Sequence, residues 1–224
     1  MKKKIIFIAC DTTSLKKIKK IIKETQNSKL IFGYKFGLQF LNSKNGRKFV
    51  SSLKNKITFG DYKLADIPNT CSSALKAVKD LKLNYVTIHI SSGLKAIKAA
   101  KKVSGSIKLI GVTVLTSLDN KALKEIGFDK DVKKLVLHQA KLASKAKLDG
   151  IVCSPHEIKI VKKVFKKEII TPGIRLLHDK KNDQIRVMTP KEAFQNGATS
   201  LVIGRSITSG NIKINIKKIV EELK

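Results

Sequence analysis

The sequence predicts an α/β protein with the (β/α)8 TIM barrel fold, and three observations support that prediction. Short apolar runs alternate with lysine-rich amphipathic segments along the whole chain, the pattern of repeated strand and helix units around a parallel sheet. Eight such runs occur, and they are continuously apolar, as strands buried on both faces are. The length of 224 residues suits a compact barrel of eight units.

The predicted strands follow these runs in order. The first run follows three lysines, is too short for the core of a signal peptide and leads directly into Asp11, so we expect a strand. The predicted strands span residues 5–10, 30–34, 57–60, 85–90, 109–114, 150–153, 169–171 and 201–203. A doubly wound open sheet is the alternative, but no G-x-G-x-x-G turn follows the first run. Since no linker interrupts the pattern, we expect one domain over residues 1–224.

The composition is strongly basic, with a formal net charge of +30 that comes from 43 Lys and only four Arg. Such a charge can indicate a polyanionic partner. The lysines, however, are spread at helix-surface spacing along the chain, and there is no Trp and only three Tyr to stack on bases. We interpret the excess as a lysine bias of solvated faces, with weak nucleic-acid association at low salt and no specific nucleic-acid partner.

Cysteine and hydropathy patterns bear on the compartment. Cys10, Cys71 and Cys153 have no metal or redox spacing, and each borders an apolar run, which predicts buried free thiols in a reducing compartment. No apolar run is long enough to span a membrane. We therefore expect a cytoplasmic protein without a membrane partner.

Polar residues follow nearly every predicted strand. In a barrel, the active site forms where the carboxyl ends of the strands meet. The residues at these positions are Asp11, Lys35, Asp61, Lys63, Asp66, His89, Thr113, Thr116, Ser154, Gly173, Arg175, Gly204 and Arg205. Their convergence predicts a functional site at this mouth of the barrel.

The third strand carries the densest charge, the motif Asp61-x-Lys63-x-x-Asp66. Side chains at i and i+2 share one face of a strand, so Asp61 and Lys63 should project together, with Asp66 returning from the turn that Pro68 enforces. Charges held together in a partly desolvated site have perturbed pKa values and a strong local field. The alternative is an ordinary solvated surface pair.

The last two strands predict a phosphate site. After the eighth strand, Gly204 and Arg205 begin a short helix, where free backbone N–H groups and a guanidinium can face an anion. After the seventh strand, a long polar segment runs from Arg175 past Gln184. A segment of this length in a barrel is usually either disordered or a lid, and the presence of Arg175 and Gln184 favours a lid that closes over a phosphorylated ligand.

Taken together, these motifs resemble the orotidine 5'-phosphate decarboxylase family over essentially the whole chain. The motif of the third strand, with its Ile-Pro-x-Thr extension at residues 67–70, is the most specific of them. The others are Ala-Cys-Asp at 9–11, Tyr-Lys-Phe-Gly at 34–37, Val-Thr-Val-Leu-Thr-Ser at 112–117, Thr-Pro-Gly-Ile-Arg at 171–175 and Ile-Gly-Arg-Ser at 203–206. Ala65 departs from the pattern, because many relatives carry His there.

The resemblance implies a reaction and the residues that carry it out. It implies decarboxylation of orotidine 5'-phosphate to UMP in pyrimidine biosynthesis, without cofactor or metal. The implied charge network is Lys35, Asp61, Lys63 and Asp66, with Lys63 as the proton donor to carbon 6 of the pyrimidine. The implied substrate contacts are Asp11 and Lys35 to the ribose, Thr116 to the base, and Arg175, Gln184, Gly204 and Arg205 to the base and phosphate. It also implies a homodimer in which Asp66, Ile67 and Thr70 reach into the partner's site.

Two other functions compete with this interpretation. A related sugar-phosphate decarboxylase or aldolase barrel can share the D-x-K-x-x-D strand, but it uses Mg²⁺ and an acidic residue where this chain has Lys35. A basic nucleic-acid-binding protein would explain the net charge but not the polar strand ends. His138, His156 and His178 lack partners at metal spacing, while His89 could either contact a ligand or hydrogen-bond to a residue that does. Ser117 and Ser154 lack a base and are not expected to be nucleophiles.

Overall fold

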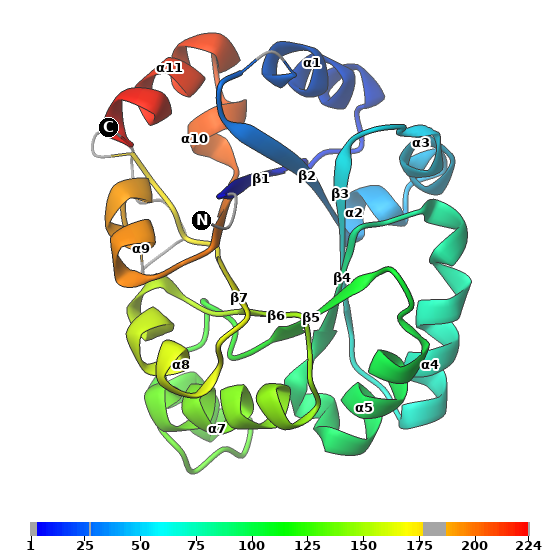
Figure 1. Cartoon of the computed structure of the whole chain (residues 1–224), viewed down its shortest axis with the longest axis vertical. Helices are drawn as coiled ribbons and strands as arrows, with labels where there is room; N and C mark the ends of the chain where they lie inside the picture. The colour runs from blue at the N-terminus through cyan, green and yellow to red at the C-terminus, as the bar shows by residue number, and fades with distance from the viewer. Residues whose placement is uncertain (1–3, 27, 177–186, 224) are drawn as a thin grey trace.

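The computed structural model of the chain describes residues 4–26, 28–176 and 187–223. Eight parallel strands form a closed barrel in the order β1 to β8, and β8 pairs with β1 to close it. The longer helices lie around the outside of the barrel (Figure 1). The prediction of a (β/α)8 barrel is confirmed.

The strands agree closely with the predicted apolar runs. They are β1 (Ile5–Ala9), β2 (Ile31–Gly37), β3 (Ile57–Leu64), β4 (Tyr85–His89), β5 (Lys108–Val112), β6 (Gly150–Val152), β7 (Glu168–Thr171) and β8 (Ser200–Ile203). Only β2 and β3 continue well past the predicted ends, through Lys35 and through Asp61 and Lys63. Charged residues can continue these strands because their side chains point into the open mouth of the barrel. On β2, for example, Lys35 faces the mouth while its neighbours Tyr34 and Phe36 are buried.

Helices connect successive strands on the outside. They are α1 (Leu15–Thr25), α2 (Leu38–Leu41), α3 (Gly46–Ser52), α4 (Pro68–Ala77), α5 (Gly93–Val103), α6 (Asn120–Glu125), α7 (Val132–Lys145), α8 (Ile158–Val164), α9 (Pro190–Asn196), α10 (Arg205–Thr208) and α11 (Ile212–Glu222). Short 3-10 turns are η1 (Lys79–Leu81), η2 (Ile90–Ser92) and η3 (Pro155–Glu157). Side chains cap several helix starts; the Asp131 carboxylate, for example, accepts a hydrogen bond from the Lys134 N–H at 2.8 Å. Such a cap satisfies one of the backbone N–H groups that a helix start leaves without an internal partner.

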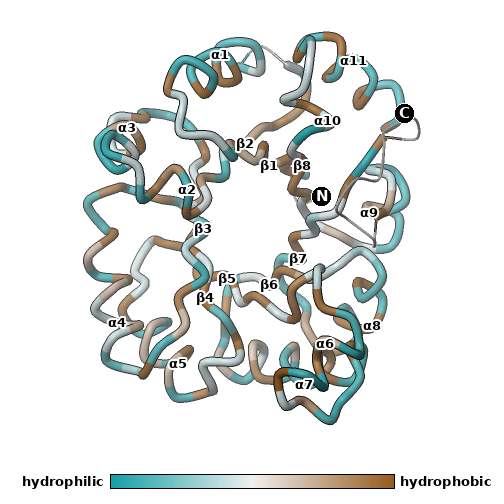
Figure 2. Tube along the Cα trace, turned by 180° about the vertical axis from the view of Figure 1, so that it is seen from behind, coloured by the Kyte–Doolittle hydropathy of each residue, from teal (hydrophilic) through white to brown (hydrophobic). Residues whose placement is uncertain are grey.

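The core has two layers. The inner layer fills the barrel, where the ring of Phe7 packs edge-on against Phe59 and Tyr85, each at a centroid distance of 5.0 Å. Gly33 makes room for it, because a Cβ there would lie 2.6 Å from a ring carbon of Phe7. The outer layer lies between strands and helices. Figure 2 shows the corresponding pattern, with hydrophobic stretches along the strands and hydrophilic stretches on the helices.

Strand alternation also determines which residues above the inner layer face the mouth of the barrel. On β3 the inward residue Phe59 is followed two and four positions later by Asp61 and Lys63, and on β1 Phe7 and Ala9 are followed by Asp11. Because side chains two apart share one face of a strand, the positions above the aromatic floor face the mouth of the barrel. The fold therefore brings the side chains of Asp11, Asp61 and Lys63 together at the mouth of the barrel.

Two further sequence predictions concern cysteines and membranes. Cys10, Cys71 and Cys153 are buried and unbridged, which confirms the prediction of buried free thiols. Burial raises the pKa of the Cys10 thiol to about 12, so the thiol stays protonated at neutral pH. Among the described residues, no helix is both long and apolar enough to cross a bilayer.

Candidate active site

A cavity of about 510 Å³ opens at the carboxyl ends of the strands. Its walls come from β1, β2, β3, β5, β6 and β8 and from the segments that follow β1 and β5 to β8. The predicted site residues that line it are Asp11, Lys35, Asp61, Lys63, Thr116, Arg175, Gly204 and Arg205. Ser154 and Gly173 also line it. The sequence-predicted convergence at this mouth is therefore observed for these residues.

Three charged side chains from β2 and β3 form the centre of the cavity. The Oδ2 atom of Asp61 accepts a hydrogen bond from Lys63 Nζ at 2.8 Å and another from Lys35 Nζ at 3.2 Å. Lys35 Nζ also lies 3.4 Å from Oδ1 of Asp11. The side chains of Lys35 and Asp61 are each only 12% exposed, whereas that of Asp11 is 62% exposed. The cluster is therefore not a solvated surface pair.

Burial and charge act in opposite directions on this cluster. Burial opposes the charged form of Lys35, but the carboxylates of Asp61 and Asp11 outweigh it and raise the pKa of the Lys35 ammonium. Burial likewise opposes the charge of Asp61, yet Lys35 and Lys63 outweigh it and lower the pKa of that carboxyl. Both groups consequently stay ionised across the neutral range, and the site keeps a fixed electric field.

Lys63 has an unusual backbone. Its φ of +50° is left-handed, a conformation that is rare for a residue with a side chain. The register between β3 and β4 shifts between Gly60 and Leu64, around this residue. Strained backbone of this kind concentrates at functional sites and persists only where neighbours hold it.

Thr87 of β4 supplies that support, and sequence reasoning missed it. Its side chain is fully buried; its hydroxyl accepts a hydrogen bond from the Lys63 backbone N–H at 2.8 Å and donates one to Oδ1 of Asp61 at 3.1 Å. One hydroxyl thus ties the strained backbone of the lysine to the carboxylate that holds its ammonium. Strand alternation could have indicated Thr87, because it lies two residues after Tyr85 and so shares the inward face of the strand.

Asp66 is not part of the cluster within one chain. Its Oδ1 atom accepts a hydrogen bond from the neighbouring Ile67 N–H at 2.7 Å. Residues 65–70 are all exposed, and the side chain of Ile67 is exposed to 65%. The four-residue network therefore comes together in this chain only for Lys35, Asp61 and Lys63, while Asp66, Ile67 and Thr70 face outward.

The opposite end of the cavity is built by β7 and β8. The chain turns at Gly204 from β8 directly into α10, as predicted, and Arg205 at the start of that helix is exposed and lines the cavity. Arg175 is buried, and its Nη1 donates a hydrogen bond to the Ile174 carbonyl at 2.8 Å. Gln184 and most of the predicted lid lie outside the described residues.

The remaining polar strand ends have local roles. The Thr113 hydroxyl donates a hydrogen bond to the Val152 carbonyl at 2.8 Å, and Ser154 caps the turn at His156. His89 is half-buried; burial lowers its imidazole pKa, Lys63 lowers it further, and Asp61 acts in the opposite direction. Within the described part of the chain, no group of three or more His, Cys, Asp or Glu side chains could hold a metal ion.

A parallel barrel with charged side chains and a glycine-arginine turn around one cavity belongs to the class of (β/α)8 barrel enzymes. Residues 4–214 match the model of the orotidine 5'-phosphate decarboxylase / HUMPS family. The chain belongs to this family, and the resemblance stated from the motifs is confirmed.

Similar proteins carry the same name. An orotidine 5'-phosphate decarboxylase of Prochlorococcus marinus (strain MIT 9215) is 43% identical over 220 residues, covering 91% of this chain and 88% of the relative. An orotidine 5'-phosphate decarboxylase of Carboxydothermus hydrogenoformans is 36% identical, covering 97% of this chain and 95% of the relative. The crystal structure of orotidine 5'-phosphate decarboxylase from Lactobacillus acidophilus has a TM-score of 0.83 at 29% identity, with 99% of each chain covered.

Proposed function

We propose that this chain decarboxylates orotidine 5'-phosphate to UMP and CO₂ in pyrimidine biosynthesis, with residues 1–224 as one catalytic domain. The named relatives support the reaction. The observation that carries the proposal is the cluster of Lys35, Asp61 and Lys63 in the barrel cavity, with 2.8 Å and 3.2 Å contacts around one carboxylate oxygen.

The substrate lies across the cavity in this proposal. Its phosphate binds at the β8 end, against the Gly204 turn and the guanidinium of Arg205, both of which line the cavity. The ribose hydroxyls bind Asp11 and Lys35, and Thr116 contacts the base. Arg175 contributes positive charge on the β7 side, and Gln184 is assigned to the same end from the family motif alone.

The reaction needs stabilisation of a negative carbon. When the bond between carbon 6 and the carboxylate breaks, its electron pair stays on carbon 6, and CO₂ leaves as a neutral molecule. The ammonium of Lys63 stabilises that pair and then donates a proton to carbon 6, after which the lysine regains a proton from solvent. No metal or organic cofactor takes part in the proposed mechanism.

Asp61 and Lys35 prepare the field before substrate arrives. The carboxylate of Asp61 fixes the Lys63 ammonium at 2.8 Å, so little reorganisation remains for the transition state. It also repels the substrate carboxylate in the ground state, and this repulsion disappears as CO₂ departs. Lys35 keeps Asp61 ionised, as the lowered pKa of that carboxyl reflects.

We further propose a homodimer with shared sites. The support is the exposed segment 65–70, which carries the predicted Asp66, Ile67 and Thr70 and places a large apolar side chain in solvent. In the dimer, Asp66 of one subunit completes the charge network of the other. Mixing a Lys63→Ala protein with an Asp66→Ala protein should then restore roughly a quarter of wild-type activity, because each mixed dimer regains one intact site. No recovery on mixing would refute sharing.

The decisive experiment for the reaction is spectrophotometric. Loss of the orotidylate absorbance on adding purified protein, unchanged by an excess of EDTA, is the expected result. A Mg²⁺-dependent sugar-phosphate aldolase would leave orotidylate untouched and lose its own activity in EDTA. Intact orotidylate after prolonged incubation with folded protein would overturn the proposal.

A further inference from the structure

A second cavity adjoins the active-site cavity at its phosphate end. It has a volume of about 410 Å³ and shares Ala9, Asp11, Gly204 and Arg205 with the first. Its other walls come from α1 and from the segment that joins α10 to α11. A ligand group bound at the Gly204 turn therefore stands at the boundary between the two cavities.

The lining of this second cavity is suited to anions. Lys17 and Lys20, three residues apart on α1 and both exposed, face it together with Arg205. The polar residues Thr12, Thr208 and Ser209 line it as well. Among the described residues that line it, Asp11 is the one with a carboxylate, and this carboxylate lies 3.4 Å from the ammonium of Lys35.

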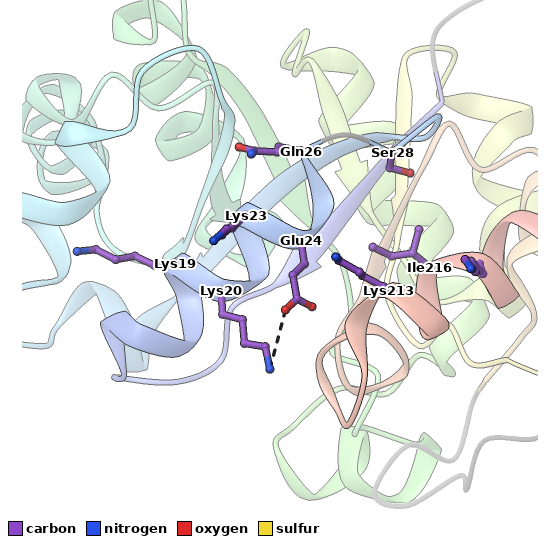
Figure 3. Close-up of a pocket in the computed structure, with 9 residues that line it drawn as sticks. Lys19, Lys20, Lys23, Glu24, Gln26, Ser28, Lys213 and Ile216 are labelled. Atoms are coloured by element: carbon purple, nitrogen blue, oxygen red, sulfur yellow. Dashed lines mark ion pairs between the residues drawn. The ribbon is translucent and has the colours of Figure 1, made fainter.

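Positive charge continues beyond the second cavity. Lys20 also lines a wider groove of about 780 Å³ between α1 and α11, whose lining includes Lys19, Lys23 and Lys213. Figure 3 shows Lys20 on α1 beside Glu24, with Lys213 on the neighbouring helix. The contact of Lys20 Nζ with Glu24 Oε1 is long, at 3.9 Å, and an exposed pair of this kind is weak. Lys20 can therefore turn to a ligand anion at little cost.

We propose that the second cavity binds the terminal phosphates of a pyrimidine nucleoside di- or triphosphate whose base, ribose and first phosphate occupy the active-site cavity. UDP and UTP are then competitive inhibitors that use Lys17 and Lys20, which a monophosphate does not reach. The proposal rests on the proposed function, because it places a uridine nucleotide in the active-site cavity with its first phosphate at Arg205.

The test compares three nucleotides on four proteins. Inhibition constants of UMP, UDP and UTP are measured in EDTA, because magnesium would neutralise the added phosphates. The matched variants are Lys17→Gln/Lys20→Gln and Lys159→Gln/Lys163→Gln, which remove the same charge from exposed positions of α1 and of α8. A Lys17→Arg/Lys20→Arg variant keeps the charge.

The expected result is that UTP inhibits about tenfold more tightly than UMP in the unchanged protein. The Lys17→Gln/Lys20→Gln protein loses this advantage while its UMP constant changes less than about twofold. The α8 variant and the arginine variant keep it. Equal loss in both glutamine variants would show a general net-charge effect and overturn the proposal, as would equal affinity for UMP and UTP in the unchanged protein.

Calorimetry separates this proposal from the proposed function. Titration of UMP and UTP into the same proteins compares the nucleotides whether or not orotidylate is consumed. Tight UTP binding that depends on Lys17 and Lys20 without decarboxylation would retain the second site and refute only the reaction. Decarboxylation by a protein that binds UMP and UTP equally would support the reaction and refute the second site.

Discussion

The two ends of the active-site cavity are built on different principles. At the β2–β3 end, the Asp61 carboxylate pairs with the ammonium groups of Lys63 and Lys35 at 2.8 and 3.2 Å, and the side chains of Lys35 and Asp61 are largely shielded from water. At the β8 end, Gly204 and the exposed Arg205 offer a backbone turn and a guanidinium that an incoming anion can reach. The first end holds its charges in contact with one another in the absence of a ligand, whereas the second presents an exposed guanidinium to the cavity.

This difference predicts different kinetic signatures. Preorganised charges stabilise the transition state more than the ground state, so changes at the β2–β3 end should reduce kcat. Groups that hold the remote phosphate act through binding, so changes at the β8 end should appear mainly in KM and in product affinity. Three substitutions test this contrast in turnover and UMP binding, and a fourth, Asp61→Asn, tests the charges of the β2–β3 end through stability; they follow in order of decreasing expected effect.

Lys63→Ala should produce the largest loss. Removing the proposed proton donor should lower kcat by more than about 10³-fold, the scale of a well-placed general acid. Orotidylate turnover and UMP binding by calorimetry are measured on the same folded protein, and UMP should still bind. Full turnover in this variant would show that Lys63 is not the proton donor and would contradict the expected kcat effect at the β2–β3 end.

Asp61→Asn should destabilise the protein in a pH-dependent manner. Losing the carboxylate between two lysines should cost on the order of 3 kcal/mol of unfolding free energy at pH 7. Because the pKa of the Asp61 carboxyl is lowered by the fold, its contribution is present above the usual aspartate range and is lost as the pH falls through the lowered value. Lys35 has a raised pKa, so its contribution is present below the usual lysine range and is lost as the pH rises through the raised value.

Urea unfolding at several pH values checks this prediction. The difference between wild type and Asp61→Asn should be largest near neutrality and narrow below about pH 4. Asp80→Asn is the control, because Asp80 pairs with Arg47 at the surface, where both side chains are well exposed. A pH-independent difference for Asp61→Asn would contradict the assigned shift.

Arg205→Ala should weaken phosphate binding with a smaller effect on the chemical step. Loss of a charge-assisted fork should raise the dissociation constant of UMP by about 10- to 100-fold. Arg47→Ala, which removes an arginine paired with Asp80 away from the cavity, serves as the charge-matched control. Unchanged UMP affinity in Arg205→Ala would place the phosphate elsewhere.

Thr87→Val should give the smallest loss, and it tests positioning. Removing the hydroxyl leaves the Lys63 N–H without its 2.8 Å acceptor and Asp61 without its 3.1 Å donor. We expect kcat to fall about tenfold, equivalent to about 1.4 kcal/mol, with little change in UMP affinity. Thr87→Ser keeps the hydroxyl and should restore kcat; a Val variant with native kcat would show that the contact only supports folding.

Some of the site was readable from the sequence because strand alternation is local. Residues two apart on a strand share a face, so the spacing predicted that Asp61 and Lys63 project together. The turn at Gly204 into a short helix could also be predicted, because a glycine and an arginine directly follow the apolar run of the eighth strand. Asp66 could be assigned to the motif but not located, because its direction depends on the exposed turn that follows β3.

Other features depend on contacts between distant segments. Thr87 is 24 residues from Lys63 and 26 from Asp61, and its contacts lie where the β3–β4 register shifts and Lys63 adopts a left-handed backbone. Likewise, the second cavity needs α1 to lie beside the segment between α10 and α11, two parts of the chain from opposite ends. Two-residue alternation after Tyr85 could indicate that Thr87 faces inward, but neither its contacts with Lys63 and Asp61 nor the packing of the two ends of the chain can be predicted from such a pattern.

The sequence by itself determined the barrel, its strands and the group of charges at one mouth, because apolar runs and two-residue alternation are local properties of the chain. The tertiary structure alone decided that Lys35 joins the pair of Asp61 and Lys63, which of these charges are buried and which cavities adjoin. Those outcomes follow from strand register and closure of the barrel, which bring together residues that no spacing rule connects.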